Sequence, residues 1–595
     1  MDPDKTPRAP GELTADPGDP SPIEPELAPL PPVDDAHPRP TSIRPEQLGF
    51  TPRRGVPWLS PVLLAGTAVR VVMAGLFGAY LDKRELQNAL QSTCFDEHAD
   101  GTDDGELWLD YVADLGDGFN ATYSVAYLLA QPRLTVDGEE LPRGRVLVMG
   151  GDQVYPTASW QQYEDRFKGP YEAALPRPPL DGDRPTMYAL PGNHDWYDGL
   201  TAFLRLFARG QGEMGGWRTR QTRSYFAIEL PHRWWLFAID AQLDAYIDDP
   251  QLRYFRQAAE GLRPGDRVIL CPPNPTWVEA TRDRQAYDTV DYFIRTVIAP
   301  TGAQVRVMLS GDLHHYARYS HADRELITCG GGGAYLYGTH RLPERLDVPP
   351  KATIVRKKSA SEEYRLAATY PSKSRSRWLA AGVFGRLPWR NPGFAGLLGT
   401  VQLLLMFALA GAAQRLTGPE RHLFTVPVAV MALVILGAAI GFSMPATAGT
   451  RRWKHWGLGA LHGAVQIGLG ALGTWAWSQL PVDDLPWPYP AILAVLIYLP
   501  ILGLLASQVV AAYLLVASLF DVNFNELFAA QGIVDHKSFL RLHLDRDGTL
   551  TIYPIAVDRV GRRWSAAPDA PAHRPWIEPT RPLTVRLAEE PIRLS

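Results

Sequence analysis

The sequence predicts a layered α/β soluble domain followed by a membrane region of about four helices. Between Trp108 and Tyr337, short apolar runs alternate with polar or helical stretches, as in layered α/β domains. From about Phe394 to Phe520 the chain is strongly apolar, although its overall content of 46% hydrophobic residues is ordinary. Because 595 residues exceed what one hydrophobic core usually supports, at least two folding units are expected.

Composition narrows the class of protein. A formal net charge of −5 gives no reason to expect nucleic-acid binding. The cysteines, Cys94, Cys271 and Cys329, are far apart and lack metal-site spacing, so no disulfide framework is predicted and a reducing compartment is favoured. The excess of Arg over Lys and the abundance of Ala, Gly and Pro favour a bacterial source.

The N-terminal part of the chain is expected to lie outside the main fold. Residues 1–52 are rich in Pro, Asp and Glu and are predicted to be a disordered tail. Residues 53–105 hold an apolar stretch, Trp58–Leu81, and a polar lead-in to the soluble domain. Arg70, near the middle of that stretch, would cost about 2.5–3.5 kcal/mol at a bilayer centre. A helix on the membrane surface, or packed on the domain, is therefore favoured over a span.

The soluble domain is assigned to residues 106–345. Helical patterns separate some of its apolar runs, and in such folds the active loops gather at one end of the sheet. The runs predicted as strands are Trp108–Ala113, Val146–Met149, Met187–Leu190, Tyr225–Leu230, Trp234–Ile239, Val268–Cys271, Val305–Leu309 and Leu326–Cys329.

A basic linker, residues 346–392, is predicted to lead into the membrane region, residues 393–520. Each of four apolar segments there has the roughly 20 residues that a bilayer requires. His462 and Gln466 lie one turn apart in the third segment and predict a hydrogen bond between helices. The segments are Phe394–Ala413, Leu423–Phe442, Trp456–Trp477 and Ala491–Phe520.

Charge predicts how the chain lies in the cell membrane. Residues 451–454, after the second segment, include three basic side chains, whereas residues 483–484, after the third, are both acidic. By the positive-inside rule, the soluble domain and the C-terminus of this multi-pass protein face the cytoplasm. The C-terminal tail, residues 521–595, contains a predicted β-hairpin around Asp547-Gly548 and can dock on the soluble domain.

Four groups of polar residues follow predicted strands, at the points where those strands end. They combine carboxylate, amide, imidazole and phenol side chains, a set that suits Mn, Fe or Zn. Two such ions about 3.5–4 Å apart can bridge a hydroxide and stabilise the attacking and leaving oxygens of a displacement at phosphorus. In chain order the groups are Asp114-Leu115-Gly116-Asp117, Gly151-Asp152-Gln153-Val154-Tyr155, Gly192-Asn193-His194-Asp195 and Gly311-Asp312-Leu313-His314-His315.

These motifs resemble those of the calcineurin-like metallophosphoesterase superfamily. The first three are similar to its purple acid phosphatase variant, whose series reads DxG, GDxxY, GNH[DE], VxxH, GHxH. Residues 114–116 match DxG, residues 151–155 match GDxxY and residues 192–195 match GNHD. The resemblance covers about Trp108 to Gly333 and implies a four-layer αββα sandwich, here followed by transmembrane helices.

The resemblance also implies a site with two divalent or mixed-valence metal ions, Mn, Fe or Zn. His194 would protonate the leaving oxygen or steady the phosphate, and Asp195 would orient its imidazole. The implied ligands are Asp152 between the ions, Asp114, Tyr155 and His314 on the first ion, and Asn193 on the second.

Two positions depart from the family's pattern. Asp312 stands where the family has the first histidine of GHxH, so a carboxylate replaces an imidazole on the second ion. After Cys271, where another histidine is expected, the chain reads Pro272-Pro273-Asn274-Pro275, and only the Asn274 amide is offered as a donor. The second site is therefore predicted to hold Mn²⁺ or Mg²⁺ weakly, or to be empty.

Three residues admit more than one interpretation. Asp117 either caps the following helix or supports the site from behind. Tyr155 either binds the metal or packs against Trp160. His315, beside His314, is a substrate-facing group, a supporting group or a ligand.

The expected protein is a membrane-anchored, metal-dependent phosphoesterase acting on a phosphate mono- or diester. Its anchor makes a lipid-linked substrate attractive, although fold and anchor alone do not choose the substrate. A first alternative is a related scaffold that has lost turnover with its second-site histidines and serves as a sensor or regulatory module. A second is a membrane protein whose helices do the main work while the soluble domain regulates them. The sequence predicts no particular oligomeric state.

Overall fold

The computed structural model describes residues 48–63, 66, 94–97, 105–178, 184–241, 246–350, 359–414, 421–444, 452–482, 484–566 and 574–595. The predicted disordered tail lies almost wholly outside the described residues, as does most of the apolar stretch Trp58–Leu81. Residues 451 and 483, used to predict orientation, also lie outside them.

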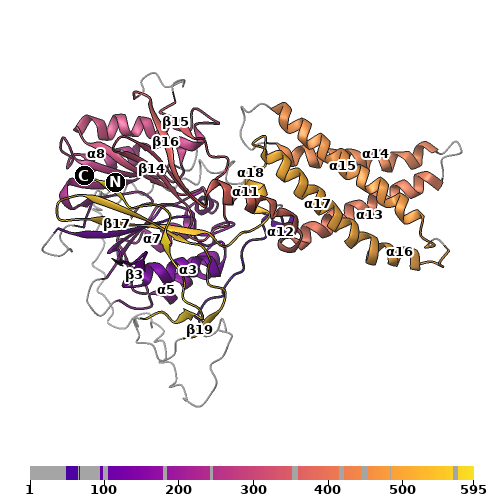
Figure 1. Cartoon of the computed structure of the whole chain (residues 1–595), viewed down its shortest axis with the longest axis horizontal. Helices are drawn as coiled ribbons and strands as arrows, with labels where there is room; N and C mark the ends of the chain where they lie inside the picture. The colour runs from indigo at the N-terminus through magenta and orange to yellow at the C-terminus, as the bar shows by residue number, and fades with distance from the viewer. Residues whose placement is uncertain are drawn as a thin grey trace, which may run out of the picture. The chain divides into compact units, whose positions relative to one another are not determined.

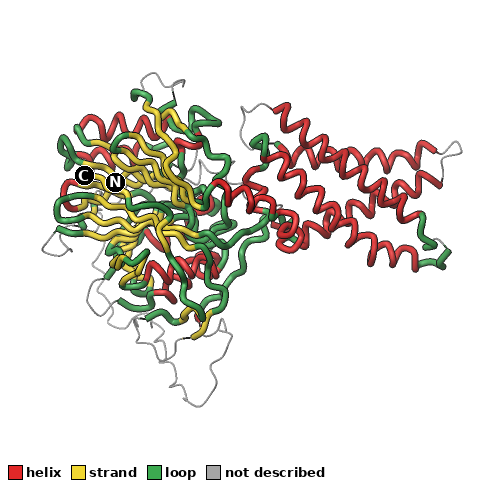
Figure 2. Tube along the Cα trace, viewed as in Figure 1, coloured by secondary structure: helices red, strands yellow, loops and turns green. Residues whose placement is uncertain are grey.

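Two large sheets make up most of the soluble part (Figures 1 and 2). The first, sheet A, has nine strands in the order β1-β9-β10-β11-β12-β14-β13-β16-β15. They are β1 (Phe95–Asp96), β9 (Phe226–Leu230), β10 (Trp234–Ala238), β11 (Arg267–Cys271), β12 (Gln304–Ser310), β13 (Tyr316–His321), β14 (Arg324–Cys329), β15 (Arg345–Val348) and β16 (Glu362–Tyr370).

The second, sheet B, follows the order β21-β18-β17-β2-β5-β6-β8-β7, with β22 also paired to β18. Its strands are β2 (Leu107–Val112), β5 (Val146–Met149), β6 (Thr186–Ala189), β7 (Gly212–Met214), β8 (Trp217–Thr219), β17 (Lys537–Leu544), β18 (Leu550–Val557), β21 (Arg586–Leu587) and β22 (Ile592–Leu594). Two small hairpin-like pairs stand apart: β3 (Arg133–Val136) with β4 (Glu139–Pro142), and β19 (Trp564–Ala566) with β20 (Ile577–Pro579).

Hydrophobic clusters show how the sheets and helices are layered. One cluster takes side chains from both sheets, such as Leu109 and Ile269, and so lies between them. A second lies between the other face of sheet B and α3, α5 and α7, and a third between the other face of sheet A and α8 and α10 (Figure 1). The helices are α3 (Phe119–Ala130), α4 (Trp160–Tyr163), α5 (Gly169–Ala174), α6 (Asn193–Trp196), α7 (Thr201–Phe207), α8 (Asp249–Ala259), α9 (Thr276–Glu279) and α10 (Asp288–Phe293), with π-helical turns at Glu164–Lys168 and Ile294–Ile298. The predicted mixed α/β fold is confirmed.

Parallel neighbours bring the predicted site loops to common edges. In sheet B, β2, β5 and β6 are adjacent and parallel, with Val112 opposite Met149 and Met149 opposite Ala189. In sheet A, β11 and β12 are also parallel neighbours. The chain therefore leaves β2, β5 and β6 at one edge of sheet B, and β11 and β12 at one edge of sheet A.

The segment predicted as a basic linker is structured where it is described. It contains most of β15, strand β16, and helices α11 (Lys373–Ala381) and α12 (Val383–Arg390). β16 pairs with β13 on one side and β15 on the other. β16 lies near the end of sheet A, and many of its side chains are partly exposed, so its sequence mixes charged and apolar residues. It therefore lacks the apolar run by which the other strands were predicted.

Three helices are long and apolar enough to cross a membrane. They comprise Pro392–Ala413 in α13 (Pro392–Gln414), Thr425–Ser443 in α14 (Arg421–Ser443), and Tyr489–Ser518, which joins α16 (Tyr489–Leu493), a π-helical turn and α17 (Leu499–Ser518). Helix α15 (Arg452–Ser478) covers the third predicted segment but is not among them in the part of the chain described. Figure 2 shows these helices as long red tubes.

Helix α15 is held by polar contacts to its neighbours. The Gln466 amide donates to the Ala506 carbonyl of α17 at 3.1 Å. Gln402 of α13 donates to the Gln466 carbonyl at 3.1 Å and to its side-chain oxygen at 3.2 Å. Gln466 therefore makes the hydrogen bonds between helices that the sequence predicted, and His462 lies 3.3 Å from its amide nitrogen.

The C-terminal segment returns to the soluble part. β17 and β18 form an antiparallel hairpin, and β17 pairs with β2 in the centre of sheet B. Arg541 and Asp110 lie directly opposite each other across this pairing, and their side chains, 0% and 2% exposed, form a forked ion pair with N–O distances of 2.7 and 3.0 Å. The tail is thus an integral part of sheet B.

Candidate functional site

Three predicted ligands from separate loops converge on the hydroxyl group of Tyr155. That oxygen lies 3.0 Å from Asp114 Oδ1, 3.1 Å from Asp152 Oδ2 and 3.0 Å from His314 Nε2. These residues follow β2, β5 and β12, so the edges of both sheets contribute to one cluster. Tyr155 packs on Trp58 and His194, with ring centroids 5.8 and 4.5 Å away, so it does not use Trp160 as the sequence also allowed.

The aspartates of the cluster share an uncommon backbone conformation. Asp114, Asp152 and Asp312 have φ angles of 60°, 51° and 67°, in the left-handed region that few residues other than glycine adopt. Such conformations gather at functional sites, where surrounding structure enforces them. Three of them, each at a strand end, show that these loops are shaped to present the carboxylates together.

Two glycines let the carboxylates approach the backbone. A Cβ atom at Gly192 would lie 2.1 Å from Asp152 Oδ1, and one at Gly330 would lie 2.2 Å from Asp114 Oδ2. Any larger residue would displace the carboxylate. Gly192, the first residue of the GNHD motif, therefore leaves the space that the Asp152 carboxylate of the preceding motif occupies.

His314 presents one ring nitrogen to the cluster. Its Nδ1 lies 2.9 Å from the Tyr335 carbonyl oxygen, and since a carbonyl only accepts, Nδ1 carries the proton. Nε2 then offers its lone pair toward Tyr155 and Asp114, which is the arrangement of a metal-binding histidine. Burial lowers the pKa of His314, and the positive charge of Lys537 lowers it further, so the ring stays neutral.

The electrostatics of the cluster favour a cation. Burial raises the pKa of Asp114, and the charges of Asp152 and Asp312 raise it further. Asp114 Oδ2 and Asn193 Oδ1 are buried without a hydrogen-bond partner in the described residues. Buried carboxylates and an unsatisfied amide oxygen match the oxygen donors that divalent metal ions take. No three His, Cys, Asp or Glu side chains among the described residues form a group that by itself could hold a metal ion.

Asp195 does not orient His194, contrary to the prediction. The His194 Nδ1 lies 2.7 Å from the Pro156 carbonyl, which holds the ring and leaves Nε2 free. Asp195 instead accepts from the Gly192 and Gln153 amides, at 2.9 and 3.3 Å, and from the Tyr163 hydroxyl at 2.5 Å. The carboxylate is fully used in shaping the loop, because the turn at α6 leaves backbone donors that it can reach.

Asp117 supports the site and does not cap the helix that follows. Its two oxygens accept from the amides of Val56, at 2.7 Å, and Tyr335, at 3.0 Å. The N-cap position of α3 is instead Gly118, which has no side chain to cap the helix. Asp117 thus joins the N-terminal segment to the loop that holds His314.

One carboxylate beside the predicted second metal position was missed. The Asn274 amide donates to Glu279 Oε2 at 2.6 Å, at the C-terminal end of the short helix α9. The charge of Glu279 raises the pKa of Asp312 more than that of Asp152 does, although burial has the largest effect. The available sequence signal was an acidic residue soon after the end of β11, whereas the family's pattern has its histidine at the strand end itself.

Two further residues reach the site from distant parts of the chain. Lys537, fully buried on β17, donates to the Ala334 carbonyl, and burial lowers its pKa to about 8. Trp58 places its ring edge-on to His194 and Tyr335, at 5.8 and 5.3 Å between centroids. Neither lies in a motif, so no local signal predicted them.

His315 lies behind the cluster. It is 1% exposed and its ring is 5.8 Å from that of Tyr337. Burial lowers its pKa to about 4, so it is neutral at physiological pH. Within the described residues, no hydrogen bond joins its ring to Asp114, Asp152 or Tyr155, and a supporting role fits this position better than ligation.

Comparisons with known proteins add little. No family model and no curated protein matches this chain. Among solved structures, one titled "GAP50 the anchor in the inner membrane complex of Plasmodium" is similar at 13% identity, covering 46% of this chain and 92% of that chain, with a TM-score of 0.30. A similarity at that TM-score supports no inference about fold or function.

Proposed function

We propose that the protein is a membrane-anchored, metal-dependent phosphoesterase, built on the αββα sandwich of the calcineurin-like metallophosphoesterase superfamily. The observation that carries this proposal is the convergence of Asp114, Asp152 and His314 on the Tyr155 hydroxyl, within 3.0–3.1 Å. Residues of the DxG, GDxxY and final histidine motifs lie far apart in the sequence, and their meeting supports a shared chemical role.

The donor set fits two metal ions. When bound, two divalent or mixed-valence ions, Mn, Fe or Zn, would polarise the phosphoryl group and lower the pKa of water. With Asp312 where an imidazole is expected, and with the Glu279 carboxylate beside Asn274, the second position favours Mn²⁺ or Mg²⁺. We assign Asp114, Tyr155 and His314 to the first ion, Asp152 to both, and Asn193, Asp312 and Glu279 to the second.

The protein's own proton-transfer group is His194. Because its Nδ1 donates to the Pro156 carbonyl, Nε2 is the nitrogen that can hold a proton for the leaving oxygen of the ester. Asp195 fixes the loop that carries it, and the Asp152 carboxylate accepts from the His194 amide at 2.9 Å. The same hydrogen bonds therefore set the positions of the proton donor and of a metal ligand.

We infer that the substrate is a phosphate mono- or diester at the membrane, with a lipid-linked compound favoured. Trp58 provides an apolar surface beside Tyr155 and His194. The next residue, Leu59, donates its amide to Asn391 Oδ1 at 3.0 Å, immediately before α13. The segment that covers the site is thus attached to the first candidate span, which suits a substrate with an apolar group near the bilayer.

Strand pairing supports four membrane crossings. β16 precedes the membrane helices and β17 follows them, yet both belong to sheets of the same soluble part. Both ends of the membrane region must then lie on one side, so the number of crossings is even. Three candidate spans require a fourth, and α15, with 27 residues, is long enough to supply it. The three basic side chains among residues 451–454, which follow the second crossing, support a cytoplasmic location for that side by the positive-inside rule.

Metal analysis and hydrolysis assays on the full-length protein test the proposed function. We expect close to two ions per chain after loading with Mn²⁺ or Zn²⁺, and hydrolysis of at least one phosphoester in a panel of monoesters, diesters and lipid phosphates. Asp152→Asn should lose most of this activity, because a carboxylate between two ions is replaced by a neutral amide. Asp323→Asn, whose side chain is 56% exposed on the β13–β14 turn, is the matched control.

Other outcomes select the alternatives. One ion per chain with binding of a phosphate compound but no turnover would favour the regulatory module. Solute flux in reconstituted vesicles would favour a function of the helices themselves. Full activity of Asp152→Asn would contradict the proposed site.

A further inference from the structure

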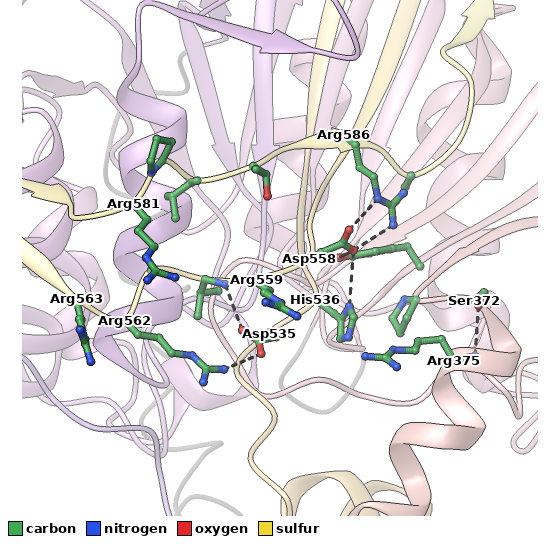
Figure 3. A pocket seen from close by; sticks show the side chains of 18 of the residues that line it. Ser372, Arg375, Asp535, His536, Asp558, Arg559, Arg562, Arg563, Arg581 and Arg586 are labelled. Carbon is green, nitrogen blue, oxygen red and sulfur yellow. Dashed lines mark hydrogen bonds and ion pairs between the residues drawn. The ribbon is translucent and has the colours of Figure 1, made fainter.

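A large cavity lies where the C-terminal segment meets sheet A, apart from the candidate site. Its volume is about 1440 Å³, and its walls come from residues 369–372 and 375, residues 535–536, residues 558–563, and residues between 580 and 588. Figure 3 shows side chains from these segments around one hollow. None of the predicted catalytic or metal-binding residues lines it.

Arginine dominates the lining of this cavity. Six guanidinium groups face two carboxylates, and burial lowers the pKa of His536 to about 4, so this ring adds no charge at neutral pH. An excess of four positive charges around one hollow attracts anions. The arginines are Arg375, Arg559, Arg562, Arg563, Arg581 and Arg586.

The two carboxylates are already engaged. Asp558 receives a forked pair of bonds from Arg586, at 3.0 and 3.1 Å, and a third from the Tyr370 hydroxyl at 2.8 Å. Asp535 accepts from Arg562 at 2.7 Å and from the Val560 amide at 3.2 Å. Their oxygens are therefore not available to neutralise the other arginines.

Four of the six arginines, Arg375 among them, have no acidic partner in the part of the chain that the structure describes. Arg559, Arg563 and Arg581 make no ion pair with any described residue. All three are exposed to solvent and line the cavity. Figure 3 places Arg559 beside Asp535 and His536, with Arg375 on the far side of His536. Planar guanidinium groups in such numbers suit a phosphate group, whose oxygens accept paired hydrogen bonds from them.

The cavity is also close to the membrane region along the chain. Arg375 lies in α11, which is followed by α12 and then by the first candidate span at Pro392. At 1.5 Å per helical residue, this path extends roughly 25–30 Å at most. Trp378 and Trp389 on these helices are 62% and 86% exposed, as expected of aromatic residues at a membrane interface.

We propose that this arginine cavity binds an anionic, phosphate-bearing ligand, at a site distinct from the catalytic centre. The ligand is either the headgroup of an anionic phospholipid or a free phosphate compound, since both present the same oxygens to the guanidinium groups. The proposal does not depend on phosphoesterase activity.

The test measures binding by full-length protein in detergent, with EDTA present so that the metal site does not contribute. Pyrophosphate binding is followed by calorimetry, and phosphatidylglycerol binding by native mass spectrometry. The double variant Arg559→Gln/Arg581→Gln should weaken binding at least tenfold, because two charged donors are lost. Arg345→Gln, whose side chain is 64% exposed on β15, removes one positive charge outside the cavity, as Arg581→Gln alone does inside it, and should leave binding unchanged.

The pattern of losses identifies the ligand. Loss of pyrophosphate binding alone indicates a free phosphate compound, and loss of lipid binding alone indicates a headgroup. The proposal is overturned if the wild-type protein binds neither probe. It is also overturned if the double variant binds both probes with the same affinity as Arg345→Gln. Thermal unfolding checks that the variants are folded, and the single variant Arg581→Gln replaces the pair if the pair is not.

Discussion

Asp114, Asp152 and Asp312 form a cluster of like charges that the protein alone does not neutralise. Burial raises the pKa of each carboxyl, and the neighbouring carboxylates raise that of Asp114 and Asp312 further. Holding such groups ionised in the fold costs free energy, unless a cation shares the site. Metal binding and folding stability should therefore be linked.

Metal addition and removal provide the first prediction. Mn²⁺ at about 100 times its Kd should raise the free energy of unfolding by about 2.7 kcal/mol, and EDTA should abolish the gain. The gain should shrink in Asp152→Asn and persist in Asp323→Asn. Differential scanning fluorimetry with and without the ion measures it, and identical melting temperatures would contradict a metal site.

Glu279 provides the second prediction. Since its carboxylate lies next to Asn274 and influences Asp312, Glu279→Gln should lower the bound metal from about two ions to about one, while the first ion stays. Atomic absorption after dialysis counts the ions. Glu213→Gln, a surface substitution on β7, is the control, and an unchanged count in Glu279→Gln would remove this residue from the site.

His536 provides the third prediction, on pH. Burial lowers its pKa to about 4, with Arg375 and Lys537 lowering it and Asp558 and Asp535 raising it. Between about pH 4 and pH 6.5, the His536 ring is therefore protonated in the unfolded chain but neutral in the folded chain. The contribution of the neutral ring to the free energy of unfolding is complete above about pH 6.5 and is lost as the pH falls toward about 4. The free energy of unfolding, measured with urea, should fall less between pH 7 and pH 5 in His536→Gln than in the wild-type protein.

The control for that prediction is His321→Gln, at the surface end of β13, which should keep the wild-type difference. If both variants show the same pH dependence as wild type, His536 is not the group responsible.

At the scale of elements, the β17–β2 pairing depends on a buried ion pair. Arg541 and Asp110 are 431 positions apart in the sequence and almost fully buried, and Arg541 also donates to the Leu141 carbonyl at 3.0 Å. A charge in such a place is tolerated only while its partner is present.

Breaking this pair gives the fourth prediction. Arg541→Ala should destabilise the protein by about 3–5 kcal/mol, because Asp110 is left buried and unpaired. Asp110→Leu/Arg541→Leu should recover much of the loss, since apolar residues replace both charges. Arg546→Ala, 66% exposed on the hairpin turn, should change stability by about 0.5 kcal/mol or less. Equal unfolding curves for Arg541→Ala and Arg546→Ala would show that the buried ion pair does not contribute to the free energy of unfolding.

Local sequence signals explain which elements could be predicted. The eight predicted strands are present because each is an apolar run, and their ends located Asp114, Asp152 and His314 correctly. β16 was missed because charged residues interrupt its pattern. The pairing of β17 with β2 had no signal, since a strand's sequence shows that it will pair but not with which partner. Asp195 was misassigned because its partners, two backbone amides and the Tyr163 hydroxyl, leave no trace in a sequence motif.

At the scale of the whole molecule, the part that carries the two sheets and the long apolar helices share a hydrophobic core. A hydrophobic cluster includes Leu59, the loop residues 335–337 and side chains of α17 and α18 (Phe524–Ala529). The loop that binds His314 through Tyr335 therefore packs on the helix that ends the membrane region. Changes in the membrane helices can reach the site through this shared core.

Membrane topology is the fifth prediction. With four crossings, a cysteine introduced at Thr450 should react with an impermeant maleimide from the cytoplasmic side, and one at Leu485 from the opposite side. Labelling of intact and inverted vesicles separates the two. Labelling of both positions from one side would mean that α15 does not cross, and would conflict with the pairing of β17 with β2.

The place of β17 in sheet B also sets an order of events during synthesis. β2 is made early, but its partner emerges from the ribosome only after every membrane helix has been translated. Until then β2 has an open edge able to pair with other chains. Lys537, whose positive charge interacts with the charges of Asp114 and Asp117, is on this same late-made strand. The candidate site is therefore expected to assemble only after the long apolar helices have been made, so that a prematurely terminated chain would carry the motifs without an assembled site.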